Sequence, residues 1–511
     1  MGAHPLVASV TASTDDSGLG RVLRGGVLNM AGAAVSAVLG LALTVTVTRA
    51  FSQETAGLLF SATSVFLIAA VVAGAGAPDG LVYFIARLRV HGTAGGTAAL
   101  LRLAAGPATA VSVAAGGALM VFAEPMARAL AVADAALYLR ILAVFLPCAV
   151  MLDTALAATR AHHVMAATVL VDKVGRPLAQ LGLVVAVGLS GSAGLLTLAW
   201  AGPYLPAAVL AWFWLGRILS RGAARRPPLG AGDTAEGVTP RTFWGFALPR
   251  AVAGIAQMGV QRGGVVLAAF LGGLAEAAVF TASTRIMVGG QFATQAVLSA
   301  AQPRFAELAA EEDHTGVRTL YQAGTSWLVC VTWPLYLTGL GCAPLIMALF
   351  GPDYATGATA LAVVCAGQLT ASALGMGDLV LTMSGRTGLN LLNNGLSLAV
   401  NLLGCAALIP VLGATGAAVA LVAAQAVRKL LPLWQLRHQV RLYPFNGPVM
   451  IATGSALCWF ASLPLLARAT LGEGFAVLAA AVAAGALGHA LTVWRLRGHL
   501  SPRQCAHIPA M

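Results

Sequence analysis

Long apolar runs recur along this chain, and they limit its possible folds more than any other feature. A run of about 20 apolar residues can cross a bilayer as a helix. Only 9% of the 511 residues are charged, against about 25% in a typical soluble domain, and 59% are hydrophobic. We therefore predict an all-α polytopic membrane protein with about fourteen transmembrane helices. The predicted runs cover residues 25–47, 57–77, 103–123, 137–159, 167–188, 194–216, 243–271, 276–301, 320–342, 356–383, 388–410, 413–432, 447–467 and 471–494.

Two polar segments divide these runs into three groups of six, six and two. The longer segment, residues 217–242, is basic and rich in Pro and Gly. The beginning of the chain is polar, and we expect a disordered tail there. The predicted parts are a cytoplasmic tail (1–24), an N-terminal lobe (25–216), a cytoplasmic linker (217–242), a C-terminal lobe (243–432), a second cytoplasmic linker (433–446), two last helices (447–494) and a C-terminal cytoplasmic tail (495–511).

The positions of the basic residues agree with this layout. If the N-terminus is cytoplasmic and the runs alternate in direction, 21 of the 30 Lys and Arg residues fall on the cytoplasmic side. The outer segments hold only Arg49, Arg128 and Arg468, and six more basic residues lie inside runs. Arg428 and Lys429, near the cytoplasmic end of the run 413–432, are counted among the 21. This asymmetry is typical of inner-membrane proteins. We predict a multi-pass protein of a bacterial plasma membrane with both termini in the cytoplasm. The net charge of +12 then reflects topology, and we expect no nucleic-acid partner.

An internal repeat relates the first two groups of runs. The segment 59–64 reads LFSATS, and the segment 279–284 reads VFTAST. In the first run, Asn29, Ser36 and Gly40 have the i, i+7, i+11 spacing that polar residues of the seventh run repeat at a nearly equal offset. Two six-helix units in the same orientation indicate parallel repeats around an axis normal to the membrane. Chance similarity between Ala-rich helices is the alternative.

The run at 246–272 is the most informative one, because it carries a polar stripe. Arg250, Gly254, Gln257 and Gln261 fall on one helical face, and Arg262 follows. A charge at mid-membrane costs roughly 3 kcal/mol on insertion scales and usually faces a bundle interior or a water-filled cavity. An interhelical packing face, or an Arg250 that reaches the cytoplasmic interface, is the alternative. For the whole stripe we favour a cavity wall.

Other runs also concentrate polar residues on one face. Small polar side chains often hold membrane helices together, at roughly 1 kcal/mol each, but four asparagines on one stripe exceed what packing needs. We predict a shared hydrophilic chamber that binds substrate and suits the hydrogen bonding of sugars. Its predicted contributors are Asn29 in the first run, Thr284, Arg285, Gln291, Gln295 and Gln302 in the eighth, and Asn390, Asn393, Asn394, Ser397 and Asn401 in the eleventh.

Three acidic residues fall inside the predicted runs and away from their ends. Asp172 and Arg176 are spaced i, i+4, which favours a structural ion pair. Asp153 and Asp378 are possible sites for a coupling proton or sodium ion, because a carboxylate in a low-dielectric site can titrate near neutral pH. Pairing with a nearby arginine is the alternative for both. Six intramembrane cations against three acids favour an anionic substrate, since guanidinium groups match phosphate.

Motifs for cofactor or metal chemistry are missing from the sequence. Neither Lys173 nor Lys429 stands in a Walker A pattern, and there is no HExxH. His162 and His163 are adjacent, which does not suit a metal site. We therefore predict a protein that is not an enzyme, with no catalytic residues, cofactor or metal.

Three segments resemble a known family. They read RVLRGGVLNMAGAAVSAVLGLALTVTVTRAFSQETAGLLFSATSV, FALPRAVAGIAQMGVQRGGVVLAAFLGGLAEAAVFTAS and LFGPDYATGATALAVV. They are similar to bacterial polysaccharide-biosynthesis (Wzx-like) flippases of the multidrug/oligosaccharidyl-lipid/polysaccharide (MOP) exporter superfamily. The resemblance covers nearly the whole chain. It implies two six-helix lobes in a V shape around a central cavity, with two extra C-terminal helices.

The resemblance also implies a function. Such proteins move polyprenyl-diphosphate-linked oligosaccharides from the inner to the outer leaflet by alternating access, for cell-surface polysaccharide or cell-wall synthesis. Relatives often carry an acid in the seventh span, where this chain has Arg262 followed by two glycines. Expected partners are the lipid-linked glycan, membrane lipids and polymerase or ligase enzymes. A lipid II flippase is a narrower variant. A drug/cation antiporter, a membrane-embedded glycan ligase or polymerase, and a non-transporting scaffold are the alternatives.

Overall fold

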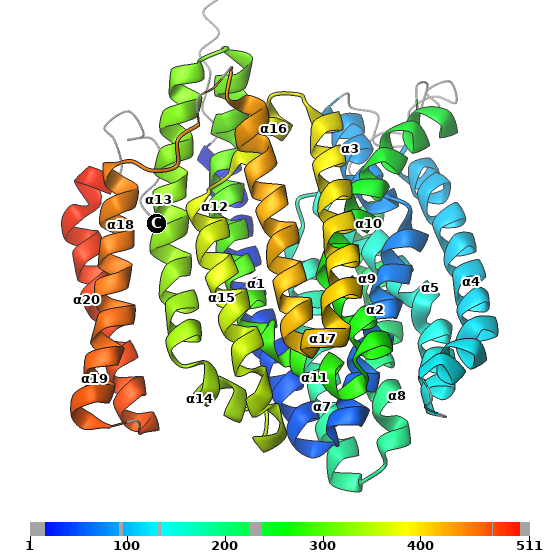
Figure 1. Cartoon of the computed structure of the whole chain (residues 1–511). Coiled ribbons are helices and arrows are strands. Elements are labelled where there is room, and N and C mark those ends of the chain that lie inside the picture. The colour runs from blue at the N-terminus through cyan, green and yellow to red at the C-terminus, as the bar shows by residue number, and fades with distance from the viewer. Residues whose placement is uncertain are drawn as a thin grey trace, which may run out of the picture.

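The computed structural model describes residues 16–90, 96–130, 132, 134–223, 238–438, 440, 442–472 and 474–500. Within these ranges the chain forms helices and no strands (Figure 1). Ten of the described helical segments are long and apolar enough to cross a membrane. The predicted all-α polytopic membrane fold is therefore confirmed, whereas the predicted number of fourteen spans is not.

The N-terminal half combines long single helices with bent or interrupted ones. The bends fall where glycine or a change of helix type interrupts the regular backbone. Its elements are α1 (Asp16–Ala50), α2 (Gln53–Gly74), α3 (Ala77–Val90), α4 (Thr97–Leu130), α5 (Asp134–Ala161), α6 (Met165–Ala167), the π-helix η2 (Thr168–Gly175), α7 (Arg176–Ser190), the 3₁₀-helix η3 (Ala193–Leu195), α8 (Leu196–Ala201) and α9 (Tyr204–Ala223).

The C-terminal half follows the same plan, and further helices complete the bundle. The half contains α10 (Pro240–Leu271), α11 (Leu274–Ser283), α12 (Arg285–Ala310), α13 (His314–Gly341), α14 (Ala343–Ala348), η4 (Pro352–Gly357), α15 (Ala358–Ala373), α16 (Gly377–Met383) and α17 (Thr387–Leu436). The last elements are α18 (Gly447–Leu457), η5 (Cys458–Ser462), α19 (Leu463–Leu471) and α20 (Phe475–Leu500).

The long element α17 consists of two antiparallel arms. Gly413 has a non-helical backbone, with φ 55° and ψ −134°, and the chain reverses there (Figure 1). Asn393 and Gln435 exchange two amide hydrogen bonds between the arms, at 2.9 and 2.8 Å. Ser397 Oγ donates to the Ala424 carbonyl at 2.8 Å. The eleventh and twelfth predicted runs are therefore both present in this element.

Several predicted boundaries differ from the structure. The helix α1 begins at Asp16, inside the predicted tail. The predicted linker 217–242 is shorter, since α9 continues to Ala223 and α10 begins at Pro240, and residues 224–237 lie outside the described ranges. The predicted run 356–383 is interrupted at Gly375, whose φ of 70° suits glycine.

The internal repeat is seen in the helix boundaries as well as in the two short sequence motifs. The ends of α3 and α12, at Val90 and Ala310, are as far apart in sequence as the two motif segments are. Gly191 and Gly413 follow matching helices at nearly the same separation, with φ of 69° and 55°. The motif segments lie in α2 and α11, and these two helices pack against each other. The repeat predicted from the sequence is thus visible in the fold.

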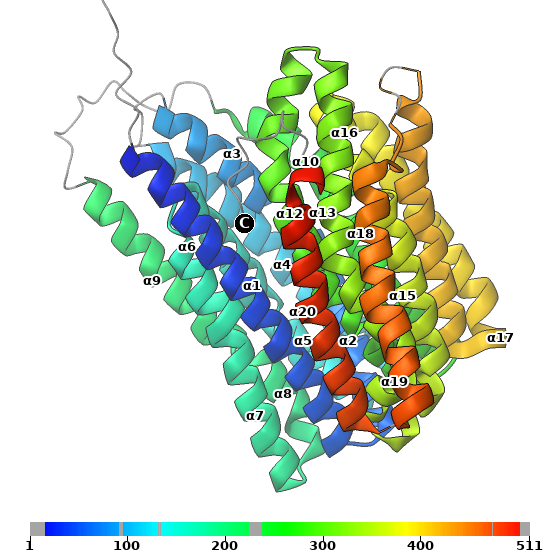
Figure 2. The same cartoon turned by 90° about the vertical axis from the view of Figure 1, so that its left-hand side faces the viewer.

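The two halves lie side by side and lean apart at one end. Figure 2 shows α1 and α9 diverging from α12 and α13 at the upper end, whereas the halves converge at the lower end. The first residue of α1 and the last of α20 both lie at the upper end (Figure 2). The predicted V-shaped pair of lobes matches this arrangement.

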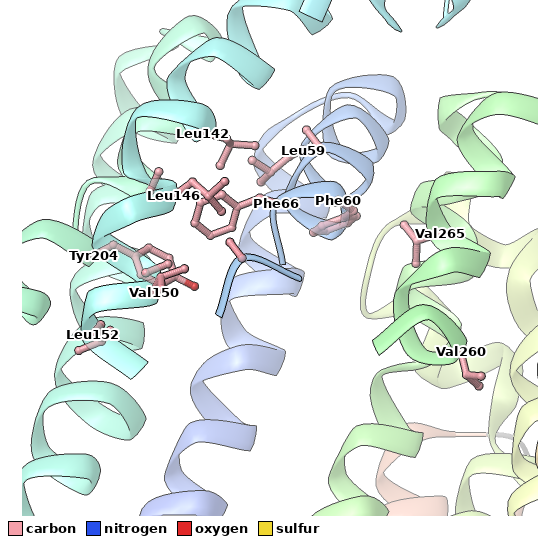
Figure 3. Close-up of a cluster of buried hydrophobic side chains, with 14 of the residues drawn as sticks. Leu59, Phe60, Phe66, Leu142, Leu146, Val150, Leu152, Tyr204, Val260 and Val265 are labelled. Carbon is pink, nitrogen blue, oxygen red and sulfur yellow. The ribbon is translucent and has the colours of Figure 1, made fainter. Parts of the chain in front are cut away.

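Aromatic and aliphatic side chains fill the interior of the N-terminal half (Figure 3). Phe66 packs edge-on against Trp200 and Tyr204, with ring centroids 5.6 and 5.4 Å apart. Phe60, also on α2, points towards α10, where Val260 and Val265 are buried (Figure 3). The helix α2 therefore joins the core of one half to the other half.

Gly57 lets α2 and α11 approach closely, which generates a prediction. A Cβ atom at Gly57 would clash with the Leu274 carbonyl oxygen, whereas one at Gly40 would meet nothing within 4 Å. We expect Gly57→Ala to lower the free energy of unfolding by about 1–3 kcal/mol, because backbone cannot yield as a side chain can. The matched variant Gly40→Ala should be neutral or slightly stabilising. Thermal unfolding in detergent measures both, and equal melting temperatures would contradict the prediction.

Candidate functional site

A polar pocket lies on the side of the C-terminal half that faces the N-terminal half. It is lined by residues of α10, α11 and α12. Gln261 and Arg262 come from α10, and Arg285 and Gln291 come from α12. Thr281 and Thr284 add hydroxyl groups, and Val265, Met287 and Val288 add apolar surface. Five residues predicted from two separate sequence stripes therefore meet in one pocket.

Both arginines of the pocket lack a compensating acid. Among the residues that the structure describes, no carboxylate lies within 4.0 Å of either guanidinium group. The two charges interact electrostatically with each other, and two like charges in a partly buried place repel. Arg285 Nε and Thr281 Oγ1 are also buried without a hydrogen-bond partner. Such a site is suited to an anion, which would satisfy these donors and remove the repulsion.

The arginines are directed across the boundary between the halves. The Arg285 guanidinium carbon lies 5.9 Å from the centre of the Phe60 ring on α2. Arg262 interacts electrostatically with Tyr204 at the start of α9. Phe60 and Tyr204 both belong to the N-terminal half, so a ligand bound at Arg285 would also lie close to α2.

Local sequence explains why Arg262 faces this space. Gly263 and Gly264 follow it, and a Cβ atom at Gly264 would lie 3.0 Å from the Phe280 ring of α11. A Cβ atom at Gly263 would lie 3.3 Å from Leu402 of α17. The glycine side of α10 thus packs closely against two helices, which leaves the arginine on the open side.

The facing wall in the N-terminal half carries charges that are partnered. Arg176 binds Asp172 at 2.8 Å, as the i, i+4 spacing predicted, and its guanidinium carbon lies 4.7 Å from the centre of the Tyr204 ring. Lys173 Nζ donates to the side-chain oxygen of Asn29 at 2.7 Å. Asp172 and Lys173 lie in the π-helix η2, a helix type that is often found at functional sites. Asn29 therefore holds a lysine of its own half.

Asp153 differs from the other intramembrane acids. It is exposed on α5, and it forms no ion pair with another residue that the structure describes. Asp172, Arg160 and Arg176 act on it electrostatically. A carboxylate without an ion pair can bind a proton or a cation, so the coupling role of Asp153 stays a prediction.

Other predicted residues of the α10 and α12 stripes lie outside the pocket. Arg250 is exposed and its guanidinium carbon stacks 4.5 Å from the centre of the Phe246 ring. It precedes Arg262 by about three helical turns, which is about 18 Å along the helix. Gln257 and Gln295 are exposed, and Gln295 Nε2 donates to Ser299 at 3.4 Å. Helical periodicity placed these residues on one face, but the pocket occupies only part of that face.

The asparagine stripe of α17 faces neighbouring helices. Asn401 is fully buried and donates to the Val260 carbonyl of α10 at 3.2 Å. Asn394 is also buried, and Asn390 is half-buried. None of the three lines the pocket. The structure thus gives Asn401 an interhelical packing contact, which was the alternative to a chamber wall.

Asp378 is held by two cations. Lys429 Nζ lies 3.2 Å from Oδ1, and Arg428 lies 3.5 Å from Oδ2. Lys429 also donates to the Gly375 carbonyl at 3.1 Å, where the chain breaks between α15 and α16. This acid has the paired arrangement that was the alternative to a coupling-ion site.

Sequence reasoning missed Tyr204 and Thr281. Tyr204 contacts Arg176 of its own half and interacts electrostatically with Arg262 of the other half, and Thr281 contributes a pocket hydroxyl. Thr281 lies within the repeat motif VFTAST, so the repeat was one sequence feature that could have identified it. No sequence feature pointed to Tyr204, because the arginines near it are distant in sequence.

Solved structures with the same architecture were found at low sequence identity. A multidrug resistance MATE family transporter of the MOP superfamily, in an inward-facing conformation, matches with TM-score 0.60 and 15% identity over 81% of this chain and 98% of that one. The lipid II flippase MurJ, in an inward closed conformation, matches with TM-score 0.69 and 11% identity over 93% and 100%. A MOP superfamily transporter from Pyrococcus furiosus matches with TM-score 0.55 and 16% identity over 82% and 95%.

These likenesses show that the chain has the fold of these membrane transporters. No protein family and no curated protein sequence matches it.

The different surroundings of Asp378 and Asp153 generate a prediction. Asp378→Asn leaves two partly buried cations without a counter-charge, so we expect it to lower the free energy of unfolding by about 2 kcal/mol or more. Asp153→Asn removes a charge that has no ion-pair partner and should change stability little. Thermal unfolding of both variants in detergent measures this difference. An unchanged melting temperature for Asp378→Asn would show that the ion pairs do not support the fold.

Proposed function

We propose that this protein is a membrane transporter that moves a polyprenyl-diphosphate-linked oligosaccharide from the inner to the outer leaflet, for cell-surface polysaccharide or cell-wall synthesis. The observation that carries the proposal is the pair of uncompensated arginines, Arg262 and Arg285, in a pocket that faces the other half of the bundle. A diphosphate supplies the missing negative charge, and guanidinium groups bind phosphate oxygens with matched geometry.

The rest of the substrate has suitable surroundings. Gln261, Gln291 and Thr284 offer amide and hydroxyl groups beside the arginines, and these can bond sugar hydroxyls. The prenyl chain stays in the lipid, because hydrocarbon gains nothing by entering a polar pocket. Asn29, Gln257, Gln295, Asn390, Asn394 and Asn401 are not needed at this pocket, and Arg250 stands nearer the end of α10 where the halves diverge, where it can meet a substrate that enters.

Alternating access accounts for the transfer between leaflets. The halves diverge at the end of the bundle where α1 begins and α20 ends (Figure 2). The positive-inside rule places this end in the cytoplasm. A substrate bound between the halves would pass to the other side when they rock. The membrane potential supplies about 2.3 kcal/mol per charge per 100 mV, and a proton at Asp153 is a second source of energy.

A drug/cation antiporter with the same fold is the second candidate. Asp153 favours it, because this exposed intramembrane carboxylate could receive a cation. The arginines of the pocket oppose it, since they repel cationic compounds. A glycan ligase or polymerase is less favoured, because none of the described residues that line the pocket carries a carboxylate, an imidazole or a thiol.

The pocket arginines provide the test of this proposal. We expect the double variant Arg262→Gln, Arg285→Gln to reduce glycan export at least tenfold, because two charge-assisted phosphate contacts are lost. Lipid-linked glycan pools are measured by mass spectrometry in a deletion strain that carries each variant, with sidedness probed in spheroplasts. The proposal expects one prenyl-diphosphate glycan to accumulate on the cytoplasmic face.

The control is Arg318→Gln, which removes an exposed arginine that stacks on Tyr443 far from the pocket. It should export normally at equal protein level. Normal export by the double variant would overturn the role of the pocket. A deletion strain without glycan accumulation, but with changed sensitivity to cationic compounds that depends on Asp153, would favour the antiporter.

A further inference from the structure

Arg49 connects the two halves at the end of the bundle where they converge. It stands in the last turn of α1 and is one of only three basic residues in the predicted outer segments. Its Nε donates to the Leu349 carbonyl at 2.9 Å, and its Nη2 donates to the Ala348 carbonyl at 2.7 Å. These acceptors belong to the end of α14, in the other half of the repeat.

The acceptors are carbonyls that the helix itself leaves free. The last carbonyls of any helix have no intrahelical donor, and the C-terminal end of a helix attracts positive charge. A guanidinium with two donors in a fixed fork satisfies two such carbonyls together. Arg49 therefore makes a charge-assisted cap on a helix of the opposite half.

Neighbouring contacts reinforce the same junction. Gln53, in the first turn of α2, donates to the Asp353 carbonyl of η4 at 3.3 Å. A Cβ atom at Gly351, which has φ 136°, would lie 3.8 Å from the Thr48 carbonyl oxygen. The end of α1 and the start of α2 thus meet the segment 348–353 over a short stretch of backbone.

The internal repeat supplies a comparison within the same chain. In the register that aligns the polar stripe of α1 with that of α10, the residue that corresponds to Arg49 is Phe270, near the end of α10. Phe270 and Val266 lie with Met126 and Leu130, at the end of α4, around a small apolar pocket. Lipid tails can replace apolar contacts between membrane helices at little cost. The corresponding junction therefore resists opening less than the hydrogen-bonded one.

We propose that Arg49 is a latch that holds the converged ends of the two halves together, and that its two hydrogen bonds must break before a substrate can leave on that side. The proposal rests on the alternating access of the proposed function. The repeat relates two junctions, α1 with α14 and α10 with α4. The proposal assigns the stabilisation of the closed end to the first of them.

Distance measurements between the halves test the latch without any substrate. Spin labels are placed at Glu54→Cys and Asp353→Cys, two exposed positions on opposite sides of the junction. Cys148, Cys458 and Cys505 are replaced by serine, and the buried cysteines are retained. Pulsed dipolar spectroscopy in lipid nanodiscs then gives the distance distribution. We expect one short distance in the parent, and about a fivefold higher ratio of long to short distances in Arg49→Ala.

The chain offers a matched control. Arg468 of α19 donates to the Gly341 carbonyl at the end of α13 at 3.3 Å, which is the same kind of cap but does not join the two halves of the repeat. Arg468→Ala should leave the distribution unchanged. Arg49→Lys keeps the positive charge but replaces the guanidinium fork by a single ammonium group. Its distance distribution should fall between those of the parent and Arg49→Ala.

An unchanged distribution in Arg49→Ala, with the protein monodisperse, would overturn the latch. An equal shift in Arg468→Ala would also overturn it, because general loosening would then explain the result. If Arg49→Ala is not monodisperse, Arg49→Lys alone decides, and a distribution equal to the parent contradicts the latch. Since no glycan is present, a failed latch leaves the export measurements untouched, and failed export leaves the distances untouched.

Discussion

The cost of placing charge in hydrocarbon governs the arrangement of this bundle. Most charged side chains inside the helices have found a partner: Asp172 binds Arg176, Lys173 binds Asn29, and Asp378 is held by Lys429 and Arg428. Each of these contacts ties neighbouring helical segments within one half. Arg262 and Arg285 depart from this pattern, because they stand together at the boundary between the halves. Their unsatisfied charge is the physical basis of the proposed substrate site.

The internal repeat explains how such a boundary arises. Two copies of one helical plan bury their motif helices α2 and α11 against each other, and Gly57 permits the close approach. Each position near the repeat axis then occurs twice, once in each half, and the two copies can carry different residues. Arg285 corresponds to Val65, and Arg49 corresponds to Phe270. Divergence between copies therefore gives one half the cationic pocket, and it gives one junction a polar cap where the other is apolar.

The candidate site was predictable in part. Spacing alone placed Gln261 on the polar face of α10, with Arg262 next to it in sequence, and placed Gln291 on the polar face of α12, with Arg285 beside that face. Periodicity reports a shared face but says nothing about which neighbour covers it. For this reason the asparagines of α17 looked like a chamber wall, although Asn401 bonds the backbone of α10 and Asn393 bonds Gln435. Arg250 and Gln257 share a face with Gln261 but stand at a different depth.

The sequence by itself determined the membrane character, the helical class, the two related halves and the excess of intramembrane positive charge. These properties follow from composition and spacing, which act locally along one helix. The tertiary structure decided which charges are neutralised and which remain free, because neutralisation depends on residues that are distant in the chain. It also decided that Arg285 lies by the Phe60 ring and that Arg49 bonds to the end of α14, since both contacts join helices whose approach no local pattern specifies.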